Sequence, residues 1–230
     1  MFHLLPVIED DISSMVELWY DAFGDPINRR LYPDTLGGRA WLEDYHRASL
    51  QSPDQHYLKV VTDSTGSTPP LVAFVKWDFN TTSPGHHFPP RHVDFDHVFC
   101  DTFFGGLDQA RRTIMGSRPH YCMLLSSIFC LFASILYHPG ACGDAPANDD
   151  TPDLDALITH PDYRRQGAAS MLIQWGCDRA DQDGIPIWVD SSQEGAQIYQ
   201  RFGFRDVSVS GVTPTGAMSM RRDPVHGEAV

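Results

Sequence analysis

The chain has little lysine and a large excess of acidic residues. Lys59 and Lys76 are its only lysines among 230 residues, and 17 lysines and arginines stand against 30 aspartates and glutamates, for a formal net charge of −13. A surface of this sign repels polyanions, so we expect no nucleic-acid partner. It would suit a cationic amine, although an acidic surface also serves solubility alone.

Cysteine pairs with metal-binding or redox spacing are also missing. The five cysteines form no CxxC pair, and they are Cys100, Cys122, Cys130, Cys142 and Cys177. An odd, scattered set predicts neither a disulfide framework nor a zinc site. One group of histidines lies near Asp94 and Asp96, and it consists of His86, His87, His92 and His97. Nothing fixes these side chains in the register of a closed site, so we interpret them as a polar loop and predict no metal.

Targeting and membrane segments are absent by the usual criteria. The start, Met1–Pro6, is briefly apolar and soon meets Glu9, which is unlike a secretory signal and predicts a cytoplasmic protein. The apolar run 122–137 is about sixteen residues long, short of the roughly twenty that span a bilayer, and no Lys or Arg follows it before Arg164. We therefore predict no membrane partner, and a single domain over 1–230.

What the chain does have is a tight turn at His160–Ser170, after an apolar run and before the helical segment Met171–Trp175. It contains neither the Gly-x-x-x-x-Gly-Lys of nucleoside triphosphatases nor the Gly-x-Gly-x-x-Gly of dinucleotide folds. Gly167 and the two alanines after it let a phosphate approach the backbone, and Arg164 and Arg165 add positive charge. Free amides at a helix start can bind a pyrophosphate without a metal. The alternative is an ordinary helix start with solvated arginines.

Hydrophobic periodicity predicts the remaining elements. Strands are expected at 2–7, 57–62, 71–77, 185–190 and 204–209, and helices at 12–23, 40–51 and 103–115. Gly24-Asp25-Pro26 is interpreted as a break. Ser191 and Glu194 have the spacing of a capping box, which predicts a further helix that carries Tyr199 and ends at Gly203.

Two ordered motifs, Arg164-x-x-Gly167-x-Ala169 and Ile198-Tyr199-x-x-x-Gly203-Phe204, resemble the GNAT superfamily of acetyl-CoA-dependent N-acetyltransferases, in particular a small fungal-type GNAT protein. The resemblance implies an α/β (α+β) fold with a mixed central sheet flanked by helices. It also implies that the sheet is splayed between its fourth strand, which ends near residues 157–159, and its fifth, from Ile187.

The resemblance further implies acetyl-CoA as the acyl donor and no metal. Residues implied to bind the cofactor are Leu157, Ile158 and Thr159 at the pantetheine arm, Arg164, Arg165, Gln166, Gly167, Ala168, Ala169 and Ser170 at the pyrophosphate, and Ser192 and Tyr199. The phenol of Tyr199 is implied to protonate the departing thiolate. The chain departs from the family where Ser192 replaces a frequent Asn and Gly195 a frequent Ala.

The acceptor side is less specified. A primary amine must lose a proton before it attacks, and the candidate bases are His120, Asp155, Asp190, Asp94 and Asp96. We favour Asp190 because it ends the fifth predicted strand. The expected activity is acetyl transfer to a small-molecule amine by direct attack in a ternary complex, from a monomer or homodimer. The alternatives are acetylation of protein N-termini or lysines, and an inactive acyl-CoA-binding module.

The segment Cys122–Asp153 has no place in the family pattern. One hypothesis is a retained intron, because Cys122-Met123 can be encoded with a donor-like GTATG and Pro152-Asp153 with an acceptor-like CAG. Its removal would leave one tyrosine codon between Tyr121 and Leu154, and one continuous strand would then lead into the turn. The alternative is a genuine surface insertion, which a loop tolerates better than a central strand does.

Overall fold

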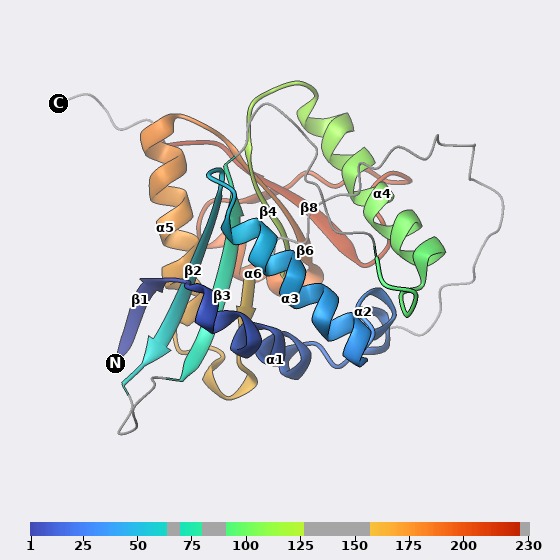
Figure 1. Ribbon diagram of the computed structural model, residues 1–230. Coiled ribbons are helices and arrows are strands. Elements are labelled where there is room, and N and C mark those ends of the chain that lie inside the picture. The colour runs from blue at the N-terminus through green and yellow to red at the C-terminus, as the bar shows by residue number, and fades with distance from the viewer. Residues whose placement is uncertain (64–69, 80–90, 127–156, 226–230) are drawn as a thin grey trace.

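A mixed sheet forms the centre of the protein, as the computed structural model shows over the residues that it describes, 1–63, 70–79, 91–126 and 157–225 (Figure 1). Its strands are β1 (Phe2–Pro6), β2 (Gln55–Thr62), β3 (Leu71–Asp78), β4 (Tyr121–Ser126), β5 (Leu157–Thr159), β6 (Ile187–Ser192), β7 (Arg205–Asp206) and β8 (Ala217–Arg222). They lie in the order β1-β2-β3-β4-β6-β8-β7, with β5 also on β3. Parallel and antiparallel pairs both occur, so the predicted mixed sheet is confirmed.

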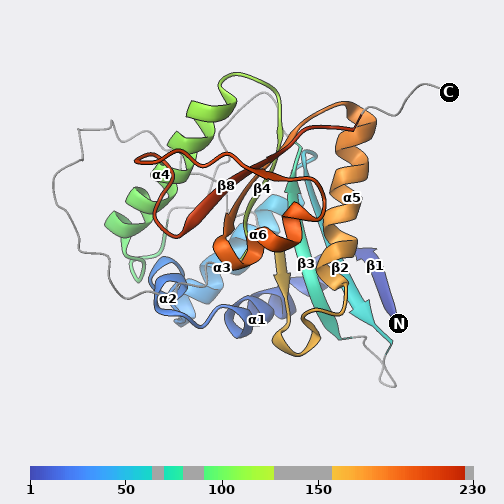
Figure 2. The same cartoon turned by 180° about the vertical axis from the view of Figure 1, so that it is seen from behind.

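Helices cover both faces of the sheet (Figures 1 and 2). They are α1 (Ile12–Ala22), α2 (Pro26–Leu31), α3 (Leu36–Leu50), α4 (His97–Met115), α5 (Ala168–Asp183) and α6 (Gln193–Gln200). On β3, Phe74 packs in the core with α1 and α3, whereas Val75 and Trp77 pack in the core with α5. This alternation follows from the two-residue period of a strand. The sheet therefore separates an α1/α3/α4 face from an α5/α6 face.

Two helices begin earlier than the apolar periodicity predicted. The helix predicted at 40–51 corresponds to α3 but starts four residues late and ends one residue late; the Thr35 hydroxyl accepts the Gly38 amide at 3.0 Å. The helix predicted at 103–115 falls within α4, where Asp96 accepts the Phe99 amide at 3.0 Å. Apolar spacing marks only the buried turns of a helix, whereas a polar cap sets its first residue.

The predicted break at Gly24–Pro26 is confirmed, because α1 ends at Ala22, but the short helix α2 that starts at Pro26 was not predicted. The Asp25 carboxylate accepts the amides of Ile27 and Asn28, both at 3.1 Å. An Asp-Pro pair at the first helical position is a start signal, since proline fixes a helical φ and lacks the amide that would go unused there.

The C-terminal strands also differ from the prediction. The strand predicted at 204–209 is reduced to β7, at the edge of the sheet, and the unpredicted β8 pairs with β6 along its whole length. The sequence of β8, AMSMRR, has few β-branched or aromatic residues, so only its tertiary pairing identifies it as a strand.

The sheet parts between β5 and β6. Leu157, Ile158 and Thr159 pair with β3, opposite residues 75, 74 and 73, while β6 runs parallel to β4 and antiparallel to β8. Within the described residues, no ladder joins β5 to β6. These are the two strands that were predicted to splay, and the turn at 160–167 leaves from the end of β5.

The segment predicted as an insertion begins inside the sheet. Cys122–Ser126 belong to β4, and the side chains of Cys122 and Met123 are buried. Residues 127–153 of the predicted insertion lie outside the described part of the chain. None of the described helices is long and apolar enough to cross a membrane.

Candidate functional site

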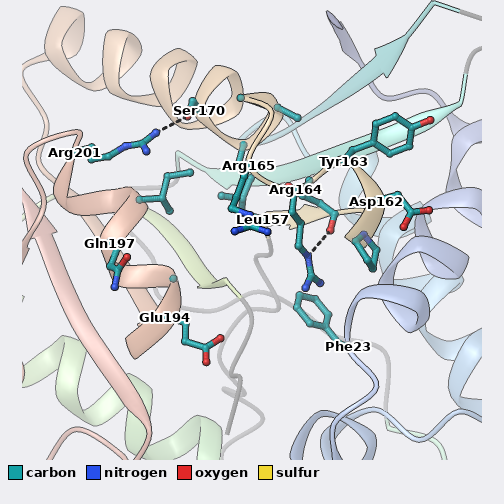
Figure 3. Close-up of a pocket in the computed structure, with 17 residues that line it drawn as sticks. Phe23, Leu157, Asp162, Tyr163, Arg164, Arg165, Ser170, Glu194, Gln197 and Arg201 are labelled. Atoms are coloured by element: carbon teal, nitrogen blue, oxygen red, sulfur yellow. Dashed lines mark hydrogen bonds between the residues drawn. The ribbon is translucent and has the colours of Figure 1, made fainter. Parts of the chain in front are cut away.

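A cavity of about 1120 Å³ opens beside the gap between β5 and β6 (Figure 3). Eight residues predicted to bind the cofactor line it, and these are Leu157, Thr159, Arg164, Arg165, Gly167, Ala168, Ala169 and Ser170. Its walls come from the turn, the first turn of α5, and α6. A cavity of this size slightly exceeds the roughly 300–1,000 Å³ typical of small-molecule sites, so it has room for an extended ligand.

Residues 161–165 of the turn and 167–170 at the start of α5 line the cavity. A short 3₁₀ turn, Pro161–Tyr163, is held by the His160 ring, whose Nδ1 accepts the Asp162 amide at 3.2 Å. Arg165 and Gly167 then take left-handed φ angles of 61° and 100°. A left-handed non-glycine residue is strained and is concentrated at functional sites. Together with the unpaired first-turn amides of α5, this backbone is suited to bind an anion.

The two predicted arginines have different roles in the structure. Arg164 donates to the backbone oxygens of Ala22 at 3.1 Å and Thr159 at 3.4 Å, so it ties the turn to the end of α1. Arg165 is exposed at the cavity. A third arginine, Arg201, was not predicted; it lines the cavity from the end of α6 and donates to the Ser170 hydroxyl at 3.3 Å (Figure 3).

Four residues predicted to bind the cofactor do not line this cavity, and they are Ile158, Gln166, Ser192 and Tyr199. Ile158 is fully buried in the core with α1, and the Gln166 amide donates to the Asp162 carbonyl at 3.0 Å. Ser192 accepts the Gly195 amide at 2.9 Å and caps α6. The predicted capping box at Ser191 is therefore wrong by one residue, because Ser191 still belongs to β6.

Tyr199 lies in the core below the cavity and does not line it. Its ring is fully buried, packs edge-on against Phe204 with centroids 5.4 Å apart, and its hydroxyl donates to the Met123 sulfur at 3.9 Å. Met123 belongs to β4, beside the gap. The phenol thus reaches from the α5/α6 face toward the strands that part.

Asp190 lies on the opposite face of the sheet, outside the cavity lining. It shares its face of β6 with Trp188, which packs with Met115 of α4. Its carboxyl accepts from the Trp188 ring nitrogen and from the Ser219 hydroxyl, each at 2.9 Å. Burial raises the pKa of Asp190 to about 7, against the lowering effect of these hydrogen bonds. It can therefore take or give a proton near neutral pH.

The other candidate bases lie elsewhere. His120 precedes β4, whose first residue pairs with the first residue of β6. The length of β6, roughly 17 Å, therefore separates His120 from the start of α6. Asp96 caps α4 and pairs with Arg30 at 2.5 Å, and Asp94 accepts from the Thr35 hydroxyl at 2.5 Å. Asp155 is outside the described residues. In the described part of the chain, no three His, Cys, Asp or Glu side chains gather as metal ligands would.

Residues that the prediction missed form the α6 wall. Glu194, Gln197, Ile198 and Arg201 line the cavity, and their spacing places them on one face of the helix. This signal is present in the sequence, once the helix is assigned. Phe23 also lines the cavity, from the end of α1, and no local pattern could place it there.

Part of the chain matches a known family. The model of the family described as "Acetyltransferase (GNAT) domain" matches residues 129–206, about a third of the chain. Residues 129–156 of the match lie outside the described part, and the rest runs from β5 to β7 and includes the turn. No curated protein matches the sequence.

Solved structures share the fold. The histone acetyltransferase HPA2 and related acetyltransferase from Corynebacterium glutamicum is 18% identical, with a TM-score of 0.54 over 99% of this chain and 98% of that one. A protein of Pyrococcus horikoshii is 11% identical, with a TM-score of 0.54 over 98% and 99%. A protein of Streptococcus mutans is 13% identical, with a TM-score of 0.50 over 96% and 98%. At these identities, the likeness shows a common fold.

Proposed function

We propose that the protein is an acetyl-CoA-dependent N-acetyltransferase. The observation that carries this proposal is the cavity at the parted strands, where a turn with left-handed Arg165 and Gly167 meets the first turn of α5. The amides of that first helical turn have no partner within the helix and can bind an anion. The residues fit coenzyme A, because such amides suit its diphosphate, and the edge of β5 that pairs with no described strand suits the amides of its pantetheine arm. The partial GNAT match adds support.

When bound, acetyl-CoA supplies a thioester carbon that a neutral amine can attack with release of the thiol. The proposed acid is Tyr199, whose hydroxyl reaches the gap from the α5/α6 face, and the proposed base is Asp190, on the other face. The two positions support a direct transfer, since the amine would lose its proton on one side of the sheet while the sulfur gains one on the other.

Acetylation assays test the proposal. The full chain with acetyl-CoA and a panel of small primary amines should release free thiol, and Tyr199→Phe should lower kcat by about 10²-fold or more while acetyl-CoA still binds. Turnover of peptides alone would favour a protein substrate. Binding of acetyl-CoA with no turnover of any amine or peptide, unchanged in Tyr199→Phe, would favour an inactive acyl-CoA-binding module and contradict the proposal.

We further propose that the segment between β4 and β5 interrupts one strand. Asp78 pairs with Cys122, and Val75, three residues earlier on β3, pairs with Leu157. In an uninterrupted strand, Leu125 would stand opposite Val75. Without the hypothetical intron, the joined strand would have three residues, from Leu154 to Ala156, opposite Lys76 and Trp77 of β3. A β-bulge accommodates one such extra residue.

This second proposal has its own test. A chain in which a single tyrosine replaces Cys122–Asp153 should fold, bind acetyl-CoA and unfold with one cooperative transition. The transcript from this region should contain the spliced form. A shortened chain that does not fold, together with genomic DNA that lacks GT and AG at the two junctions, would contradict this second proposal.

A further inference from the structure

We propose that Arg201 recognises the ribose 3′-phosphate of coenzyme A and so makes the protein discriminate coenzyme A from its 3′-dephospho form. This inference rests on the proposed function. Coenzyme A carries its negative charge at two separate places, the diphosphate and the 3′-phosphate. A site for the whole cofactor therefore needs anion-binding groups in two places.

The first anion-binding group is the turn. It combines the amides at the start of α5 with the exposed side chain of Arg165. Arg164 also lines the cavity and keeps its charge, but two of its nitrogens already donate to the backbone oxygens of Ala22 and Thr159, so fewer N–H groups remain for a phosphate. The turn thus forms one compact site of the kind that binds a diphosphate.

The second group comes from a different element. Arg201 directly follows α6 and reaches the cavity from the opposite wall, where its Nη2 donates to the Ser170 hydroxyl (Figure 3). Ser170 is the third residue of α5, so this contact fixes the guanidinium at the edge of the amide cluster. Ile198, one helical turn earlier, adds an apolar surface on the same wall.

The pairing of the neighbouring arginines sets Arg201 apart. Arg205, Arg221 and Arg222 each form an ion pair with an aspartate, at Asp223 or Asp181. Within the described residues, no carboxylate pairs with Arg201. A guanidinium has five N–H donors, so the contact with Ser170 leaves most of them for a doubly charged phosphate. Its exposure at the cavity also lets a ligand reach it.

Binding to coenzyme A and to 3′-dephospho-coenzyme A tests the inference, measured by isothermal titration of the full chain. The wild type should bind coenzyme A at least about tenfold more tightly. Arg201→Gln should bring this ratio close to one and leave the affinity for the dephospho form unchanged. Arg201→Lys should keep part of the ratio. Arg205→Gln, a matched loss of charge outside the cavity, should keep all of it.

Two results would overturn the inference while the proposed function stands. In one, Arg201→Gln weakens both ligands by the same factor, which would assign Arg201 to the diphosphate. In the other, the wild type does not discriminate between the ligands. If a folded wild type bound neither ligand, the proposed function would fail as well, and circular dichroism of each variant separates this from loss of structure.

Discussion

The two faces of the sheet carry different kinds of polar group. On the α5/α6 face, the polar groups are exposed at a cavity, and most of them come from one stretch of chain, 157–170. On the α1/α3/α4 face, the polar groups are buried and come from distant segments, as His46, Lys76 and Asp190 do. The α5/α6 face therefore offers polar groups that a ligand can reach. On the α1/α3/α4 face, burial sets the protonation of the polar groups.

The buried groups illustrate the second case. Lys76 is fully buried, and its ammonium donates to the Tyr45 hydroxyl at 2.5 Å. His46 shares a hydrogen bond of 3.0 Å with the Tyr57 hydroxyl, and burial together with the charge of Lys76 lowers the pKa of His46 to about 3. His46 thus stays neutral while Asp190, at the same face, titrates near pH 7.

The largest expected effect is on catalysis at the buried face. Asp190→Asn keeps the size of the side chain but removes the base; its amide oxygen can still accept from the Trp188 ring nitrogen, and its amide nitrogen can donate to the Ser219 hydroxyl. We expect kcat to fall by about 10²- to 10⁴-fold, with acetyl-CoA affinity unchanged. Steady-state kinetics and a titration measure the two quantities. Full activity of this variant would show that Asp190 is not the general base.

The pH dependence of stability separates two groups on the same face. Asp190 has a folded-state pKa above its unfolded value, so its contribution to the free energy of unfolding falls as pH rises from about 4 to 7. His46 has a folded-state pKa below its unfolded value, so its contribution rises with pH between about 3 and 6.5. The two slopes, each about 1.4 kcal/mol per pH unit, oppose one another between about pH 4 and 6.5.

A variant that removes one of the two groups should reveal the pH dependence of stability that the other group causes. Relative to the wild type, Asp190→Asn should gain stability as pH rises through this window, and His46→Gln should lose it. Urea unfolding at several pH values, with the double variant as control, measures the difference. Curves that run parallel to the wild type would show that neither group titrates as its burial implies.

On the cavity face, a charge at the start of α5 should block the cofactor. Ala169→Glu places a carboxylate among the amides, where it competes with the diphosphate and repels it. We expect acetyl-CoA affinity to fall by about 10- to 100-fold. Ala169→Gln adds the same bulk without the charge and should retain more of the affinity, as calorimetry would show. Equal losses in both would mean that space, not charge, limits binding there.

The smallest effect should distinguish the two neighbouring arginines. Arg164→Gln loses the contacts to Ala22 and Thr159 and should lower the free energy of unfolding by about 1 kcal/mol. Arg165→Gln, at an exposed side chain, should leave stability unchanged and weaken acetyl-CoA binding. Denaturation and titration of both variants check this, and a reversed pattern would exchange their roles.

The sequence was sufficient to predict the cavity face, because a turn followed by a helix start is a local feature. Gly167 and the small residues after it predict an anion site without knowledge of the rest of the fold. The fold class followed from the same motifs. The caps at Thr35 and Asp96 are local signals too, but the helix prediction rested on apolar spacing and did not include them.

The buried face could not be predicted in the same way. Whether Asp190 is solvated or sealed depends on Trp188, Ser219 and α4, and β8 was not predicted to be a strand at all. The same limit applies to Phe23, which reaches the cavity through packing alone. Such positions depend on contacts between segments far apart along the chain: 29 residues separate Asp190 from Ser219, and 142 separate Arg164 from Ala22.

The most direct test of the central claim is an NMR titration of the labelled full chain with acetyl-CoA, followed by backbone amide shifts. We expect the largest shifts at Arg165, Gly167, Ala168, Ala169 and Ser170, the residues at which the turn meets α5. Amides of α3, on the other face of the sheet, should shift little. Saturating acetyl-CoA that leaves the amides of the turn unmoved would contradict the assignment of this cavity to the cofactor.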